Sequence, residues 1–261
     1  MKVIVTGASD GIGGATALRL AEDCAARGEP IELVLTASGR KPAPQALIDR
    51  LAAGGARATF LTADLADPAA CAGLAARTLE TLGGLDAFVS NAGASVPHRL
   101  AELPVEDWDR TFAVNTRPTF LLAQAFRPAL AASKGSIVAV ASMSGLRPHK
   151  GLGAYSAAKA ALIMLARVLA QEWAADGIRV NAVAPGMIRT PLTERIYQHA
   201  EVKARREALV PLGRIGAPED IAAVVAFLAG PGSAYVTGQV VLADGGIADS
   251  ALGAIPGLPA T

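Results

Sequence analysis

The sequence predicts one α/β domain, with a doubly wound parallel sheet of seven strands and helices on both of its faces. Short apolar runs alternate along the chain with longer segments whose apolar residues recur at helical spacing. The short runs are apolar throughout, which is typical of parallel strands that are buried on both faces. The first run also leads directly into a glycine-rich turn that opens a helix.

Strands and helices are expected to alternate along nearly the whole chain. Strands are expected at residues 2–6, 31–37, 56–61, 86–90, 136–141, 178–184 and 240–243. Helices are expected at residues 11–27, 44–53, 67–82, 105–131 and 155–175. No internal repeat or linker divides residues 1–246, so we expect one domain there, followed by an aperiodic tail at 247–261. We interpret the polar segment 190–211 as a lid over a site, with a solvated surface helix as the alternative.

The composition favours a globular protein with a sizeable core. Of 261 residues, 52% are hydrophobic and 18% are charged, which argues against disorder. The net charge of +1 and the aromatic content of 4% argue against a nucleic-acid partner. No continuous apolar run reaches the ~18 residues of a membrane span, and the N-terminus lacks a signal-peptide pattern. Cys24 and Cys71 lack metal-ligand spacing, so we expect buried thiols, no metal site and a cytoplasmic location.

One stretch carries the residue types of acid-base chemistry. Ser142 follows an apolar run, and Tyr155 and Lys159 stand four residues apart after a loop rich in Gly and Pro. On a helix this spacing places both side chains on one face. A nearby ammonium lowers the pKa of a phenol, ordinarily ~10, and so allows a tyrosine to exchange protons with a substrate oxygen. The alternative interpretation is a surface tyrosine and lysine on an ordinary helix.

Three glycines, Gly7, Gly11 and Gly13, separate the first strand from the first helix. Glycines at such a turn let backbone N–H groups approach a pyrophosphate, and the helix N-terminus favours its negative charge. The spacing Gly-x-x-x-Gly-x-Gly differs from the Gly-x-Gly-x-x-Gly fingerprint, but its place between strand and helix predicts a Rossmann-type dinucleotide site.

The end of the second strand indicates which dinucleotide is bound. An acidic residue there would bind the ribose of NAD, whereas a basic residue accommodates the 2′-phosphate of NADP. The chain has Arg40 and Lys41 and no acid at this place, which favours NADP(H). Asp10 in the glycine loop argues the other way, so NAD(H) remains possible, and an exposed turn is the alternative interpretation of the two basic residues.

These motifs resemble those of the short-chain dehydrogenase/reductase family over residues 2–246. The matching parts are residues 6–13, 63–65, 91–93, 185–190, 211–221, 235–239 and 244–246, together with Asn115, Ser142, Tyr155 and Lys159. The resemblance implies a Rossmann fold and an NAD(P)-dependent oxidoreductase. Within the family, the C-terminal segments resemble most the corresponding segments of the 3-oxoacyl-(acyl-carrier-protein) reductases.

The resemblance also implies a role for each matching site residue. Tyr155 would be the acid/base at the substrate oxygen, Lys159 would lower its pKa and bind the nicotinamide ribose, and Ser142 would orient that oxygen. Asn115 would hold a water that connects Lys159 to solvent. Cofactor contacts are implied for Tyr155, Lys159, Gly7, Ser9, Asp10, Gly11, Ile12, Gly13, Arg40, Asp64, Leu65, Asn91, Ala92, Gly93, Pro185, Gly186, Ile188 and Thr190.

The expected substrate is a small ketone or secondary alcohol, and an uncharged one because the expected pocket walls are mostly apolar. Its expected contacts are Val96, Ser144, His149 and Met187. A thioester of acyl-carrier protein or CoA is the alternative, although Asp176 stands where relatives that dock the acidic carrier tend to carry arginine. A non-catalytic nucleotide sensor or scaffold is a third possibility, which the intact catalytic positions disfavour. The resemblance further implies a homotetramer or homodimer, with neither nucleic acid nor a membrane as partner.

Overall fold

A computed structural model describes residues 1–40 and 42–250 and contains a seven-stranded, all-parallel sheet in the order β3-β2-β1-β4-β5-β6-β7. The predicted fold class is therefore confirmed, and every strand begins and ends within one residue of its expected bounds. The strands are β1 Lys2–Thr6, β2 Glu32–Ala37, β3 Arg57–Thr62, β4 Ala87–Ser90, β5 Ser136–Val140, β6 Arg179–Pro185 and β7 Val240–Ala243.

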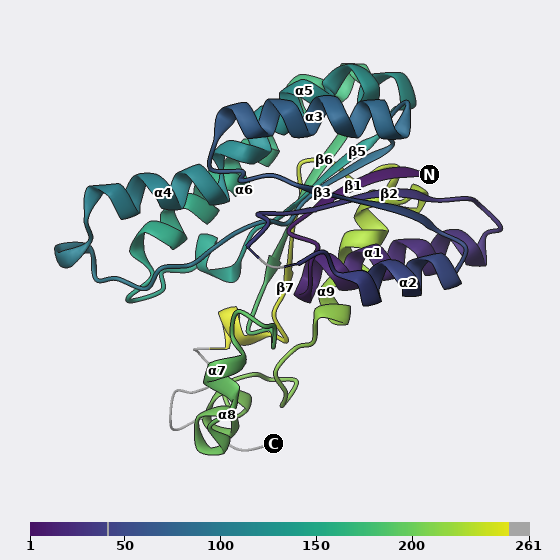
Figure 1. The fold of residues 1–261 in the computed structure, drawn as a ribbon. Helices are drawn as coiled ribbons and strands as arrows, with labels where there is room; N and C mark the ends of the chain where they lie inside the picture. Colours follow the sequence, from purple (N-terminus) through teal and green to yellow (C-terminus); the bar gives the residue numbers. More distant parts are fainter. Residues whose placement is uncertain (41, 251–261) are drawn as a thin grey trace.

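Helices cover both faces of this sheet (Figure 1). One face carries α3, α5 and α6, and the other carries α1, α2 and α9. The core accordingly forms two apolar clusters, the first of which contains the edge-to-face rings of Phe88 and Phe126, 5.4 Å apart. The helices are α1 Gly11–Ala26, α2 Gln45–Ala53, α3 Pro68–Leu82, α4 Val105–Asn115, α5 Arg117–Ser133, α6 Gly153–Trp173, α7 Glu194–Tyr197, α8 Ala200–Glu207 and α9 Pro218–Ala229.

The region 105–131, expected to form one long helix, forms two helices, α4 and α5. The prediction of a single continuous helix was therefore wrong. The chain breaks at Thr116, whose φ and ψ are −128° and −54°. The physical reason is Pro118, which has no N–H to offer and crowds the carbonyl four residues before it. The next amide, Thr119 N–H, donates to Thr116 O at 3.1 Å. The break therefore removes the donors that would usually meet the carbonyls of Val114 and Asn115.

The strand order predicts a ligand-binding crevice at the carboxyl edge of the sheet. β1 pairs with β2 on one side and with β4 on the other, so the chain winds outward in opposite directions from this point. Ligands of such sheets bind outside the carboxyl ends of the strands, where the order reverses. The glycine loop follows β1, residues 91–93 follow β4, and Ser142 follows β5, so all three lie at this edge.

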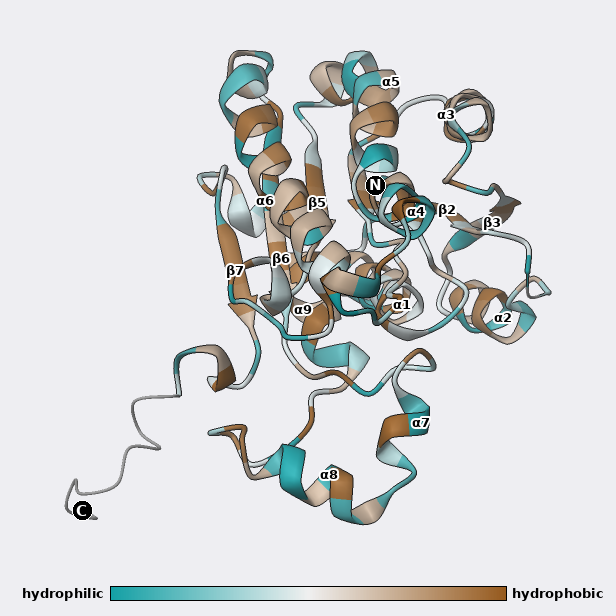
Figure 2. Cartoon of the chain, turned by 90° about the vertical axis from the view of Figure 1, so that its left-hand side faces the viewer, coloured by the Kyte–Doolittle hydropathy of each residue, from teal (hydrophilic) through white to brown (hydrophobic). Residues whose placement is uncertain are grey.

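The segment expected to be a lid contains α7 and α8, which lie apart from the sheet and its covering helices (Figure 2). α8 is mostly polar, and the guanidinium of Arg206 lies 5.7 Å from the ring centroid of Tyr197. Beyond α8, Val210 packs tightly on Gly245, where a Cβ would lie 2.5 Å from Val210 Cγ1. The segment is thus anchored after α8, while its role as a lid stays a prediction. Of the expected tail, 251–261 lie outside the described residues.

One helical stretch among the described residues, Gly153–Asp176, is long and apolar enough to cross a membrane by length and composition. It was not expected from continuous apolar runs because charged residues, including Lys159, interrupt it. In this structure it packs against β5 and β6 as a core helix of the sheet, with Ala158, Leu162 and Ala166 buried.

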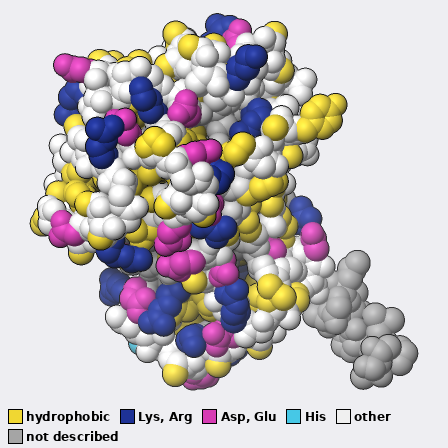
Figure 3. Space-filling model, turned by 90° about the vertical axis from the view of Figure 1, so that its right-hand side faces the viewer, with side chains coloured by type: hydrophobic (Ala, Val, Ile, Leu, Met, Phe, Trp, Pro, Cys, Tyr) yellow, Lys and Arg dark blue, Asp and Glu magenta, His cyan; other side chains and the backbone are white. Residues whose placement is uncertain are grey.

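Charged groups and thiols are placed as the composition suggested. Basic and acidic side chains are interspersed over the face in Figure 3. Cys24 and Cys71 are buried in α1 and α3, as predicted, and burial raises the pKa of both thiols.

Candidate active site

The glycine loop is built around close approaches that side chains would prevent. A Cβ on Gly13 would lie 2.3 Å from Gly7 O, and one on Gly7 would lie 2.8 Å from Ala92 Cα. Gly7 and Gly11 have φ values of +65° and +54°, the left-handed region that favours glycine. The loop can therefore turn sharply into α1 and leave its N–H groups facing the crevice. Ser9, Asp10 and Ile12 are partly exposed there, and Asp10 precedes the first turn of α1.

Asn91 fastens the end of β4 to this loop. Its side-chain amide donates to Thr6 O at 3.0 Å and to Gly7 O at 2.9 Å. Its main-chain N–H and that of Ala92 both donate to the hydroxyl of Thr6, at 3.0 and 3.1 Å. The Asn91 side chain thus shapes the nucleotide site from behind, so its predicted contribution to cofactor binding is one of positioning. Thr6 was not predicted as a site residue. A threonine directly before a glycine turn could have indicated it, because its hydroxyl can bind main-chain N–H groups of a neighbouring loop.

The segment after β6 comes over the glycine loop. A Cβ on Gly11 would lie 3.6 Å from both Thr190 Cβ and Pro191 Cδ. Gly186 lies so close to Asp244 that a Cβ would come within 2.5 Å of its side chain. Pro185 ends β6, Ile188 is buried and bridges to Gly216, and Met187 is partly exposed. The predicted cofactor contacts that follow β1 therefore lie next to those that follow β6, as the contact between Gly11 and Thr190 shows.

Three of the predicted cofactor contacts, Arg40, Asp64 and Leu65, follow strands β2 and β3. Arg40 is exposed after β2, and Lys41 lies outside the described residues. Asp64 is exposed, and its carboxylate accepts a hydrogen bond from Ala66 N–H at 3.1 Å. Leu65 is 7% exposed and belongs to the core, so only its main chain can meet a nucleotide.

Lys159 is buried at the centre of the site. Its ammonium donates to Val140 O at 2.9 Å, and lies 5.7 Å from the centroid of the Tyr155 ring. Burial without a carboxylate partner lowers the pKa of Lys159 to about 8. Both side chains project from α6, as the four-residue spacing predicted.

The tyrosine pKa does not shift in the predicted direction. Burial raises the pKa of Tyr155, and a hydrogen bond with Ser142 opposes that rise only in part. The expected lowering by Lys159 does not contribute to this shift, and the Lys159 ammonium donates instead to Val140 O. Tyr155 is therefore protonated at neutral pH in this arrangement, and Ser142 is within hydrogen-bonding reach of the phenol.

Asn115 supports the site from the end of α4 and is 2% exposed. Its side-chain N–H group donates to Ala94 O at 2.8 Å and Thr111 O at 2.9 Å, and its carbonyl oxygen accepts from Ala94 N–H at 3.2 Å. Gly93 lies between the side chains of Asn115 and Lys159. A Cβ on Gly93 would lie 2.7 Å from Asn115 Oδ1 and 3.3 Å from Lys159 Nζ, so there is no room for a side chain at this position. The side chain of Asn115 thus fixes the chain after β4 beside the lysine.

Three of the four predicted substrate contacts lie on two loops near Ser142, and the fourth, Met187, lies on the segment after β6. Ser142 Oγ accepts from Ser144 N–H at 3.2 Å, and the buried hydroxyl of Ser144 is hydrogen-bonded to His149 Nδ1 at 3.0 Å. Val96 is 39% exposed on the loop after β4. That loop meets the other one through a bridge between His98 and Leu152. Ser144, His149 and Val96 therefore lie on two loops that are in contact with each other.

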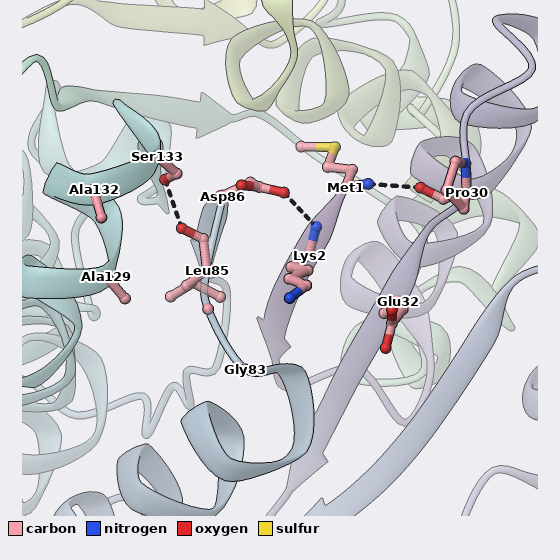
Figure 4. Close-up of a pocket in the computed structure, with 11 residues that line it drawn as sticks. Met1, Lys2, Pro30, Glu32, Gly83, Leu85, Asp86, Ala129, Ala132 and Ser133 are labelled. Atoms are coloured by element: carbon pink, nitrogen blue, oxygen red, sulfur yellow. Dashed lines mark hydrogen bonds between the residues drawn. The ribbon is translucent and has the colours of Figure 1, made fainter.

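A surface pocket lies at the opposite edge of the sheet, at the amino ends of β1 and β2 (Figure 4). Lys2, Glu32, Asp86 and Ser133 contribute to its lining. The Asp86 carboxylate accepts from Lys2 N–H at 2.7 Å, and Ser133 Oγ donates to Leu85 O at 2.7 Å. Its polar groups are engaged in closing the sheet edge, and it is remote from Tyr155. Among the described residues no cluster of three or more His, Cys, Asp or Glu side chains is found.

The parallel sheet and the glycine loop after its first strand define a class of protein, the Rossmann-fold proteins that bind a dinucleotide. A family model described as enoyl-(acyl carrier protein) reductase matches residues 7–248. The chain belongs to the short-chain dehydrogenase/reductase family.

Relatives cover almost the whole chain. Cis-4-hydroxycyclohexanecarboxylate dehydrogenase of Sinomonas cyclohexanicum is 39% identical over 245 residues, which are 93% of this chain and 94% of the relative. The 3-oxoacyl-(acyl-carrier-protein) reductase of Thermotoga maritima is 36% identical over 247 residues, which are 94% and 96% of the two chains. A short-chain dehydrogenase from Burkholderia cenocepacia, solved with NADP, has a TM-score of 0.84 at 34% identity and covers 94% of this chain and 97% of its own.

Proposed function

We propose that this protein transfers a hydride between a nicotinamide cofactor and a small, uncharged ketone or secondary alcohol. The observation that carries the proposal is the meeting of Ser142, Tyr155 and Lys159 at the carboxyl edge of the sheet, next to the glycine loop. A phenol, a hydroxyl and a buried ammonium at one crevice are the groups that a carbonyl reduction requires. A sensor or scaffold would have no need of them.

The crevice fits a dinucleotide. The glycine loop leaves no room for a Cβ at Gly7 or Gly13 and opens α1 with free approach to its N–H groups. Gly11, Thr190 and Ile188 would enclose the diphosphate and nicotinamide, and the main chain near Leu65 would meet the adenine. The cofactor supplies the hydride when bound. Arg40 and the NADP-bound Burkholderia relative favour NADP(H), with NAD(H) as the alternative.

Tyr155 is the proposed proton donor in the direction of reduction. Because burial keeps its phenol protonated at neutral pH, it is ready to give a proton to a developing alkoxide. Ser142 Oγ would hydrogen-bond the same substrate oxygen and hold it in line. Lys159 would bind the nicotinamide ribose and return the proton to Tyr155. The break after Asn115 leaves main-chain carbonyls available for a water beside this lysine.

The substrate would enter between the loops that carry Val96 and His149, with Met187 on the side of the segment after β6. The relative from Sinomonas acts on cis-4-hydroxycyclohexanecarboxylate, which supports a secondary alcohol as the reacting group but carries a carboxylate in addition. The lid segment 190–211 would close the mouth, and residues 1–246 would act as one unit.

A thioester reductase activity is the second candidate, and one observation favours it. Asp176, which was expected to repel an acidic carrier, is paired with Arg127 at 2.8 Å, and this guanidinium also lies 5.6 Å from the centroid of Trp173. The ion pair has no net charge, so Asp176 no longer presents an uncompensated negative charge to an acidic carrier. The Thermotoga relative acts on such carriers.

We also propose a homotetramer or homodimer through α4, α5 and α6. These helices expose Trp108, Phe120, Met164 and Val168, which are 37% to 55% exposed in the single chain. Exposed apolar side chains gathered on neighbouring helices are typical of a protein interface.

A substrate screen tests the proposed function. Ketones, secondary alcohols and 3-oxoacyl thioesters would be offered with NADPH, NADH or their oxidised forms, and the nicotinamide absorbance would be followed. Turnover of a small ketone or alcohol supports the main proposal, and turnover confined to thioesters supports the second candidate. Cofactor binding without turnover of any member of the three classes would favour a sensor or scaffold.

A further inference from the structure

A second hollow lies beside the glycine loop, on its outer side. It is lined by Ser9 of the loop and by one face of the first two turns of α2, namely Pro44, Gln45, Ala46, Leu47 and Arg50. α2 is held against α1 here, since a Cβ on Gly14 would lie 3.5 Å from Leu47 Cδ2. The hollow is therefore fixed relative to the glycine loop, and Arg50 lines its far side.

Arg50 differs from most arginines that surround it in the sequence. Arg19 pairs with Asp23 at 2.8 Å, and Arg57 pairs with Glu32 at 2.8 Å. In the described part of the chain, the guanidinium of Arg50 has no hydrogen-bond or ion-pair partner. The neighbouring acid on α2, Asp49, accepts instead from the side chain of Gln45 at 2.8 Å. An exposed guanidinium that faces a hollow in this way is available to an anion.

We propose that Arg50 is a second determinant of NADP preference and binds the 2′-phosphate from α2, opposite Arg40. This inference rests on the proposed cofactor. The adenosine ribose of a dinucleotide lies between the glycine loop and the end of the second strand. Ser9 belongs to the first of these elements, and Arg40 follows the second. A phosphate on that ribose would point toward the hollow that Ser9 shares with Arg50.

Two of the residues that line the hollow, Ser9 and Arg50, carry hydrogen-bond donors that can bind a phosphate. Ser9 Oγ, at the near wall, can donate a hydrogen bond to a phosphate oxygen. The guanidinium of Arg50, at the far wall, offers several N–H donors and a fixed positive charge.

Binding of adenosine phosphates tests the inference without turnover. Calorimetry would measure 2′,5′-ADP and 5′-AMP on the full-length wild type, Arg50→Gln and Arg40→Gln. Arg57→Gln is the matched control, because it removes an exposed arginine at the amino edge of the sheet. We expect Arg50→Gln to weaken 2′,5′-ADP about tenfold and to leave 5′-AMP unchanged, as expected for loss of one charged hydrogen bond. The KM for NADPH should rise by a similar factor, with kcat preserved.

Three results would overturn the inference. The first is that Arg50→Gln binds both nucleotides with wild-type affinity, whereas Arg40→Gln loses its affinity for 2′,5′-ADP. The second is an equal loss of both nucleotides, which would mean that Arg50 does not read the 2′-phosphate. The third is a wild type without preference for 2′,5′-ADP. In that case NADP preference fails too, but Tyr155-dependent ketone reduction with NADH would show that the proposed reaction stands.

Discussion

The ammonium of Lys159 donates a hydrogen bond of 2.9 Å to the main-chain oxygen of Val140, and only 3% of the residue is exposed. This contact joins α6 to the carboxyl end of β5, so it holds the catalytic helix against the strand that delivers Ser142. Within residues 1–40 and 42–250 no carboxylate pairs with this ammonium, so its charge is costly to bury, and burial lowers the pKa of the lysine to about 8.

Replacing this lysine should therefore not destabilise the protein at neutral pH. The unfolded state binds the proton up to pH 10.5 and the folded state only up to about 8, so wild-type stability rises with pH between these values. We expect Lys159→Met to be more stable than the wild type at pH 7, by about 1–3 kcal/mol after loss of the hydrogen bond. The difference should shrink toward pH 10. Urea unfolding across this range measures it, and a constant difference would contradict the assigned burial.

Gly13 is required for the approach of the glycine loop to Asn91. In Gly13→Ala the new methyl group would meet Gly7 O at 2.3 Å and Asn91 Nδ2 at 2.6 Å, so the loop must shift. We expect a loss of about 2–4 kcal/mol in unfolding free energy and at least tenfold weaker cofactor binding. Gly73→Ala is the control, because that position on α3 is exposed and has no atom within 4 Å of a new Cβ. The control should be about 0.5–1 kcal/mol more stable. Equal behaviour of the two variants would refute the packing argument.

Asn115 makes three hydrogen bonds through its side chain, and Asn115→Leu removes all of them while it keeps the same number and branching of side-chain heavy atoms. The Ala94 N–H and carbonyl would then lose their partners beside Lys159. We expect a loss of about 2–4 kcal/mol of stability, since each unsatisfied buried group costs ~1–3 kcal/mol. Thermal unfolding and kcat should fall together. A fully active variant with wild-type stability would show that the chain after β4 does not depend on this side chain.

The raised pKa of Tyr155 predicts a pH dependence that differs between the two reaction directions. Alcohol oxidation requires the phenolate, whose population grows as pH rises, so kcat/KM for oxidation should increase up to tenfold per unit below the tyrosine pKa. Ketone reduction requires the phenol and should be level near neutrality, then fall at alkaline pH. An oxidation rate that stays level from pH 7 to 10 would contradict the role given to Tyr155.

Much of the fold could be predicted because strands buried on both faces leave continuous apolar runs, which mark their own ends. The break between α4 and α5 was missed, although Pro118 carries the signal, because apolar periodicity continues across it. The catalytic spacing on α6 was predictable from helix geometry alone. The direction of the Tyr155 pKa shift was not, because it depends on the burial of the phenol and on its hydrogen bond with Ser142, which only the folded chain provides. The link between Thr6 and Asn91 joins residues far apart in the chain, which local pattern cannot reveal.

The central claim is that Tyr155 transfers the proton, and one measurement tests it most directly. Single-turnover reduction of a ketone identified in the screen would be followed with NADPH for the wild type and Tyr155→Phe, with NADPH affinity measured on both proteins. We expect the variant to bind NADPH normally and to reduce the ketone at least about 100-fold more slowly, the usual contribution of a positioned acid. A variant that binds NADPH and reduces the ketone at the wild-type rate would contradict the claim.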